Sequence, residues 1–320
     1  MKMKTEEIIK LIKYVTGSVA AVLLAAALQL QFAYAAGIIT LLTIQDTKKE
    51  TVRITAKRMI IFVIMTILSA VIFPFAGYHV WAFGIVLIPY LFSCMALDMK
   101  EAIAPIAVLC THYVSAKSCS PSMILNEFLI LVIGAGIGTL WTLYMPDGRR
   151  QLLDYQKTVD DKIVYILHRM AIYIELEDKT DYTGSCFDEL DAMLVNLKKE
   201  ALRYMNNHLI TEDDYYYEYM QMRARQCVIL KRIYADIIRL TTTPEQGKAL
   251  ADFIRQTADE FEEQNNVETL LSELERLHHY YEQQPLPVTR QEFENRSMLY
   301  HILEDMKAFL DIKKDFITAR

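Results

Sequence analysis

The sequence contains a short segment in which five basic side chains lie close together, directly after its first long apolar stretch. A dense group of cations concentrates anions in front of it, and an arginine can hold a carboxylate through two parallel hydrogen bonds. The segment could therefore form the mouth of a path for organic anions. It could equally serve only to orient a membrane protein, as basic loops do. Its members are Lys48, Lys49, Arg53, Lys57 and Arg58.

Arg58 stands out in this group because it directly precedes an apolar segment that begins at Met59. A guanidinium at that position could turn inward, into the membrane domain. Gln45 and Asp46 end the preceding apolar stretch and could face it. Trp81 lies at the start of a later apolar segment. We therefore predict a substrate path formed by Arg58, Lys57, Arg53, Gln45, Asp46 and Trp81.

Two further ionisable residues, His112 and Glu127, fall inside apolar segments. Such groups are costly within a membrane and are candidates for proton relays. We take His112 as the first candidate and Glu127 as the second. A neutral histidine bonded to a helix carbonyl is an equally good interpretation of His112.

The elements that must position these side chains follow from an uneven composition. The chain has 320 residues, of which 53% are hydrophobic, and its mean hydropathy is +0.15. Between Tyr14 and Met145 charged residues are few and confined to short clusters, whereas from Asp147 onward they occur throughout. Because this length allows two domains, we predict a transmembrane domain over residues 1–146 and a cytoplasmic helical domain over residues 147–320.

Apolar segments of suitable length indicate about six membrane spans. A spanning helix needs about 20 apolar residues, or fewer where the bilayer is thinned. The stretch from residue 14 to 44 is too long for one span and short for two, and Gln29 and Gln31 mark a turn in it. We predict a hairpin of two short helices there. The later segments are Met59–Phe73, Val80–Leu97, Ala102–Ser115 and Met123–Met145.

The loop charges predict an orientation. Basic residues gather before the first span, between the second and third, between the fourth and fifth, and after the sixth, while the alternate loops hold only Lys117. Basic loops stay on the cytoplasmic side. We therefore expect a multi-pass protein of the bacterial plasma membrane with both termini in the cytoplasm. The apolar run that follows Lys2 and Lys4 resumes beyond Ala35, so we expect no signal-peptide cleavage.

The second half repeats apolar residues at helical spacing, as in Val159, Ile163, Ile166 and Met170. A capping box begins at Thr289. We predict an all-α bundle of about five or six helices.

Several classes of function are disfavoured. The net charge of −6 argues against nucleic-acid binding. The five cysteines show no metal-ligand spacing, and we expect no metal, cofactor or enzymatic activity. The glycine run from Gly134 to Gly138 lacks the preceding strand of a dinucleotide site. It instead suits close packing of membrane helices.

Two stretches carry a resemblance to a known family. The first runs from Tyr34 through Gln45-Asp46-Thr47 to Arg58, and the second from Asn126-Glu127 through the glycine run to Met145-Pro146. Together with six spans and a helical tail, they resemble the Gram-positive branch of the aromatic acid exporter family, within the wider fusaric acid resistance group. The resemblance covers essentially the whole chain.

The resemblance implies export of aromatic or related organic acids, driven by the proton gradient. Plant malate transporters in the wider group suggest a passive anion channel as an alternative. A third hypothesis is a non-transporting module whose helical domain senses a ligand or docks a partner. The expected partners are the lipid bilayer, a small organic anion and further copies of the chain, in a homodimer or higher homo-oligomer.

Overall fold

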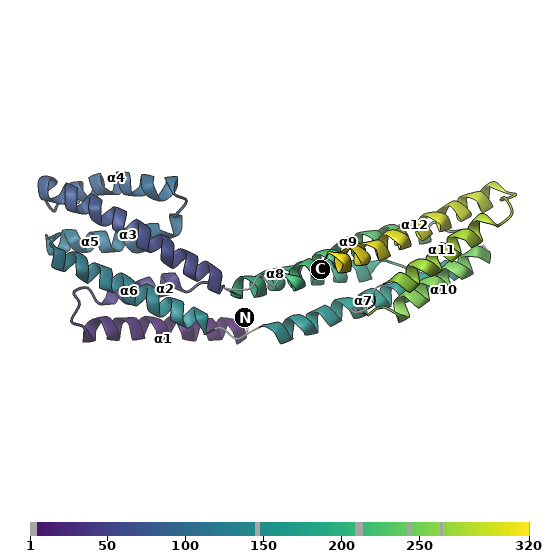
Figure 1. The fold of residues 1–320 in the computed structure, drawn as a ribbon, viewed down its shortest axis with the longest axis horizontal. Coiled ribbons are helices and arrows are strands. Elements are labelled where there is room, and N and C mark those ends of the chain that lie inside the picture. Colours follow the sequence, from purple (N-terminus) through teal and green to yellow (C-terminus); the bar gives the residue numbers. More distant parts are fainter. Residues whose placement is uncertain are drawn as a thin grey trace. The chain divides into compact units, whose positions relative to one another are not determined.

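The computed structural model describes residues 5–144, 148–208, 214–241, 245–262, 265 and 267–319. Within these residues every regular element is a helix and none is a strand, which confirms the all-α class. The chain divides into two compact units. One contains α1 to α6 and the other nearly all of α7 to α12 (Figure 1), and each is described separately. The expected boundary at residues 146–147 lies outside the described residues, and α7 begins at Arg149.

The first unit consists of six α-helices and one short 3-10 turn. They are α1 (Thr5–Ala27), α2 (Tyr34–Thr43), α3 (Lys48–Ala76), α4 (Val80–Ala96), η1 (Lys100–Ala102), α5 (Ile103–Ala116) and α6 (Pro121–Leu143). Helix α2 packs between α1 and α6, while α3 packs against α4, α5 and α6. Large apolar side chains point outward as well as inward, for example Ile88 and Phe92, which are 72% and 73% exposed. Such a surface suits lipid rather than water.

The lengths of these helices refine the predicted spans. Three described segments are long and apolar enough to cross a membrane, namely Ile8–Ala27, Lys48–Ala76 and Pro121–Leu143. The turn predicted near Gln29 is present between α1 and α2, but the hairpin is unequal, because α1 has 23 residues and α2 only 10. At 1.5 Å per residue α2 is about 15 Å long, half of a hydrocarbon core of about 30 Å. Six helices are therefore present, but α2 is too short for a full span, and α5, with 14 residues, is only about 21 Å long.

Helix α3 also begins earlier than predicted. Its N-cap is Thr47, whose hydroxyl accepts a hydrogen bond from the Glu50 backbone N–H at 3.4 Å, and the helix starts at Lys48 instead of Met59. The expected basic loop is therefore wrong: Lys48 to Arg58 form the first three turns of α3. The apolar pattern of the sequence does not reveal these first turns, because their charged residues interrupt the apolar run by which a span is identified.

The glycine run of α6 packs against α2, as its spacing predicts. A Cβ atom on Gly134 would lie 2.7 Å from the Ala36 carbonyl oxygen, and one on Gly138 would lie 2.7 Å from Thr43 Cβ. Both distances are too short for real contacts. Only glycine allows the two helix backbones to approach this closely.

The second unit is a bundle of six helices in the described residues, within the predicted number. They are α7 (Arg149–Glu175), α8 (Ser185–Asn207), α9 (Tyr215–Ile237), α10 (Glu245–Asp259), α11 (Glu268–Glu282) and α12 (Arg290–Thr318). Their apolar stripes form one continuous core that includes Ile163, Leu230 and Leu303. The capping box is confirmed, because the Thr289 hydroxyl accepts from the Glu292 N–H at 3.1 Å.

Candidate functional site

Arg58 is almost completely buried in the first unit, with only 2% of its surface exposed. Its Nη2 donates a hydrogen bond to the Leu42 carbonyl oxygen at 2.7 Å, and its Nη1 donates to the Thr43 hydroxyl. Both acceptors belong to the last turn of α2, where backbone carbonyls lack partners within the helix. Arg58 therefore joins α3 to the C-terminal end of α2, where the helix dipole favours a cation.

No carboxylate is in direct contact with the Arg58 guanidinium in the described residues. In the described part of the chain no Asp or Glu oxygen lies within 4 Å of its guanidinium, and its buried Nε–H has no hydrogen-bond partner. A buried charge without a counter-charge is unfavourable, and within a membrane it marks a functional candidate. An anion bound beside Arg58 would supply the missing charge.

The neighbouring basic residues lie nearer the surface. Lys57 Nζ donates to the Asp98 carbonyl oxygen at 2.7 Å and to a Glu101 carboxylate oxygen at 3.3 Å, so its charge is already compensated. Arg53 is exposed on the preceding turns of α3. These two residues contribute to the field around the N-terminal end of α3 without sharing the buried surroundings of Arg58.

Gln45 and Asp46 follow α2 but face different partners. Gln45 Nε2 donates to the Leu42 carbonyl oxygen at 3.0 Å, which is also the acceptor of Arg58. Asp46 instead forms an exposed ion pair with Lys10 of α1. Of the two predicted residues, only Gln45 shares a contact with Arg58.

Trp81 lies away from this group. It occupies the first turn of α4, is 58% exposed, and its ring stacks on that of His79 with 6.0 Å between the ring centroids. A short connection links the end of α3 to the start of α4, so Trp81 lies beside the end of α3 that is remote from Arg58. The structure does not bring Trp81 into contact with the other predicted path residues.

His112 and Glu127, predicted separately as relay candidates, are in direct contact. Nδ1 of His112 lies 2.7 Å from Oε2 of Glu127, and their residues are 8% and 0% exposed. They come from α5 and α6. A buried imidazole–carboxylate pair can hold or pass a proton, because both groups change charge with one proton. On α6, Glu127 lies about 18 Å before Thr139 along the helix axis. The Thr139 hydroxyl lies 3.1 Å from the hydroxyl of Thr55 on α3.

Phe32, Asn126 and Gln31, none of which the sequence assigned to a functional site, complete this second group. The Phe32 ring stacks on His112 with 4.2 Å between centroids and an interplanar angle of 11°. The Asn126 side chain exchanges two hydrogen bonds with the Gln31 backbone, at 2.9 and 3.1 Å, and donates a third to Glu127 Oε1 at 3.0 Å. The turn between α1 and α2 thus covers the His112–Glu127 pair. No sequence signal indicates this contact, which joins residues about 80 to 95 positions apart.

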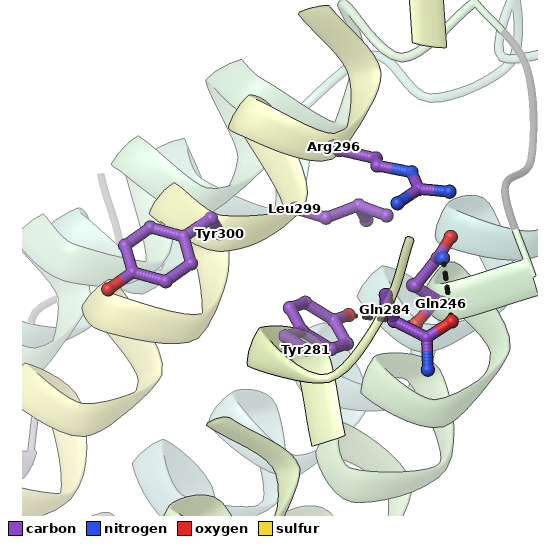
Figure 2. A pocket seen from close by; sticks show the side chains of 6 residues that line it. All are labelled: Gln246, Tyr281, Gln284, Arg296, Leu299 and Tyr300. Carbon is purple, nitrogen blue, oxygen red and sulfur yellow. Dashed lines mark hydrogen bonds between the residues drawn. The ribbon is translucent and has the colours of Figure 1, made fainter. Parts of the chain in front are cut away.

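Other chemistry is sparse in the described residues. No group of three or more His, Cys, Asp or Glu side chains there is placed to hold a metal ion, and the five cysteines are free. The second unit has a cavity of about 120 Å³. Figure 2 shows Arg296 directed toward the Gln246 and Gln284 amides across it, while the Tyr300 ring points away. The residues that line the cavity are Gln246, Tyr281, Gln284, Arg296, Leu299 and Tyr300.

The first unit has helices long and apolar enough to cross a membrane and contains a buried arginine and a buried His–Glu pair, while the second unit is a helical bundle, so the chain is of the membrane-protein class. The comparisons identify the family. Residues 6–145 match the family described as "Aromatic acid exporter family member 1". Residues 149–314 match the domain described as "Putative aromatic acid exporter C-terminal domain". The chain belongs to the aromatic acid exporter family, as its sequence motifs indicated, and at the level of this family it is a membrane transporter.

Two relatives show how far the similarity extends. A protein of Bacillus subtilis (strain 168), named "Uncharacterized protein YqjA", is 30% identical over 305 residues, which cover 95% of this chain and 94% of that protein. A crystal structure described as "Crystal structure of putative membrane protein from Clostridium difficile 630" is 31% identical, with a TM-score of 0.46. It matches over 52% of this chain and 99% of its own.

Proposed function

We propose that this protein exports aromatic carboxylates across the bacterial plasma membrane in exchange for protons. The observation that carries this proposal is Arg58, a buried guanidinium without a carboxylate partner in the membrane unit of an exporter family. A substrate carboxylate beside it would gain a charge-assisted hydrogen bond and would relieve the uncompensated charge. Lys57 and Arg53 would raise the local concentration of such anions.

The proposed orientation would assign a side of the membrane to each group. Basic loops favour the cytoplasmic side, which would place the N-terminal end of α3 there. Helix α3 has 29 residues and is about 44 Å long, so roughly nine residues exceed a hydrocarbon core of about 30 Å. If that excess lies at the basic end, Arg58 stands near the inner edge of the core. A cytoplasmic acid would meet it first.

The His112–Glu127 pair favours proton coupling. It lies in the half of α6 that is remote from Thr139, and therefore toward the outer side in this orientation. A proton entering from outside would bind the pair, and the substrate would leave in the opposite direction. The Phe32 ring covers the pair, so exchange of this proton would require movement of the turn between α1 and α2.

Transport into proteoliposomes tests the proposal. Labelled benzoate is supplied at neutral pH under an imposed pH gradient, and protein-free liposomes correct for passive entry of the neutral acid. We expect the change Arg58→Gln to reduce uptake at least about tenfold, since a charge-assisted hydrogen bond contributes about 1.5–3 kcal/mol. Arg53→Gln removes the same charge from an exposed position on the same helix, so it measures the effect of the local field alone and should reduce uptake less than Arg58→Gln. Equal uptake by both variants would refute the role of Arg58.

A second measurement separates coupled export from a channel. The change Glu127→Gln should abolish accumulation driven by the pH gradient while benzoate still moves down its own gradient. If the protein instead conducts steady single-channel currents in a planar bilayer, the alternative of a passive anion channel replaces the exchanger.

A further inference from the structure

A ring of tyrosines surrounds Arg169 in the second unit. The guanidinium carbon of Arg169 lies 5.8 Å from the centre of the Tyr165 ring, 5.2 Å from that of Tyr173 and 5.3 Å from that of Tyr182. Tyr165 and Tyr173 are one turn before and one turn after Arg169 on α7, so the three side chains share one face of that helix. Tyr182 comes from the segment that connects α7 to α8.

Arg169 has no carboxylate partner within 4 Å in the part of the chain that is described. By contrast, Arg232 and Arg255 on the same unit form ion pairs with acidic side chains. The hydrogen bonds of Arg169 are long. Nη1 donates to the Tyr165 hydroxyl at 3.4 Å, and Nη2 donates to the Tyr173 hydroxyl at 3.2 Å and to the Asp181 carbonyl oxygen at 3.5 Å. A carboxylate would offer shorter, charge-assisted bonds in their place.

Tyr182 provides an independent sign of an incomplete set of contacts. It is 3% exposed, and its ring stacks on that of Tyr173 with 4.1 Å between centroids, yet its buried hydroxyl has no hydrogen-bond partner. Buried tyrosine hydroxyls usually have one. The side chains around Arg169 therefore include a cation without an anion and a phenol without an acceptor.

We propose that Arg169, Tyr165, Tyr173 and Tyr182 form a binding site for an aromatic carboxylate. The carboxylate would accept hydrogen bonds from the Arg169 guanidinium and from the hydroxyls of Tyr165 and Tyr173, which lie beside it. The aromatic ring would stack on Tyr165, which is 48% exposed and therefore accessible. An aliphatic acid would lack the stacking, and an uncharged aromatic compound would lack the ion pair.

The cavity of Figure 2 fits this ligand less well. Its arginine, Arg296, already donates to a Glu292 carboxylate oxygen and to the Pro285 carbonyl oxygen. The local charge is therefore balanced before any ligand binds. Arg169 is the better anion site because its charge is not balanced in this way.

The proposed site rests on the proposed function in one respect, namely that its ligand is of the same chemical class as the exported acid. The second unit would then detect the compound that the first unit removes. Binding at Arg169 can nevertheless be measured whether or not Arg58 has its proposed role.

Calorimetric titration of the full-length protein in lipid nanodiscs with benzoate tests the site. The background carries Arg58→Gln, so that the remaining signal reports the second unit. We expect Arg169→Gln to weaken the benzoate affinity at least about tenfold. Arg239→Gln, which alters a 72% exposed arginine side chain of the same unit, should leave it within twofold. Circular dichroism and thermal unfolding of each variant check that the fold is intact.

Two analogues of benzoate test whether the aromatic ring of the ligand and its charge both contribute to binding. Cyclohexanecarboxylate, with the same charge but no aromatic ring, and benzamide, with the ring but no charge, should each bind at least about fivefold more weakly than benzoate. The proposal is overturned if benzoate does not bind in the Arg58→Gln background, if Arg169→Gln and Arg239→Gln bind alike, or if cyclohexanecarboxylate binds as well as benzoate. If Arg58→Gln leaves transport unchanged, the proposed function loses its main support. The comparison of the Arg169 and Arg239 variants then remains valid in the wild-type background.

Discussion

The contact between α2 and α6 allows a sharp test with two glycines of one helix. The change Gly134→Ala would place a methyl group 2.7 Å from the Ala36 carbonyl oxygen and 2.8 Å from Ile39 Cβ. The same change at Gly136 would meet no atom within 4 Å. The two variants therefore differ in packing but not in the residue type that is introduced or in the helix that receives it.

The magnitude follows from this difference. Ordinary contacts of a Cβ atom begin near 3.4 Å, so α2 and α6 would have to separate by about 0.7 Å at Gly134. Overpacking of this kind costs about 1–3 kcal/mol. Alanine also favours a helix over glycine by up to about 1 kcal/mol, but this gain is common to both variants and cancels in their comparison. Gly134→Ala should therefore be about 1–3 kcal/mol less stable than Gly136→Ala.

Thermal unfolding in detergent measures this difference directly. A loss of 1–3 kcal/mol corresponds to a reduction in Tm of roughly 3–10 °C for a unit of this size. Benzoate transport should also fall in Gly134→Ala, because Arg58 depends on the position of the last turn of α2. Equal Tm values for the two variants would refute the close approach of the helices.

Two further predictions concern the second unit. Arg223 is fully buried, and its Nε lies 2.9 Å from an Asp160 carboxylate oxygen. Arg223→Met should therefore destabilise the protein by about 3–5 kcal/mol. The control Arg225→Met, at an exposed position, should change Tm little. Burial, with a smaller contribution from Asp191, raises the pKa of the Cys227 thiol to about 12. In a variant that retains only this cysteine, the thiol should resist alkylation at pH 8 until the protein unfolds. Because its pKa in the unfolded chain is about 8.5, its contribution to stability is complete below that pH and is lost as the pH rises toward 12. Rapid alkylation of the folded protein at pH 8 would contradict the predicted protection of the Cys227 thiol.

Some of the site residues predicted from the sequence lie together in the structure, and others do not. Arg58 was singled out because it precedes an apolar run, and it is indeed buried, but as the partner of the α2 C-terminus. His112 and Glu127 were selected only because ionisable groups are costly in a membrane, and they form one buried pair. Asp46 faces Lys10, and Trp81 lies beside the other end of α3. Asp46 lies in the connection between α2 and α3 and Trp81 lies on α4, so neither is held on the helix face that carries Arg58.

The sequence by itself determined the helical class, the apolar first half, the amphipathic second half, the turn near Gln29 and the family. These properties depend on composition and on local periodicity, which a single chain displays directly. It could not determine that α2 ends beside Arg58, that Asn126 holds the turn over His112 and Glu127, or that three tyrosines surround Arg169. Each of these contacts depends on how helices approach one another. That approach is decided by side-chain packing between segments distant in the chain, such as the contact of Gly134 with Ala36, and no local pattern records it.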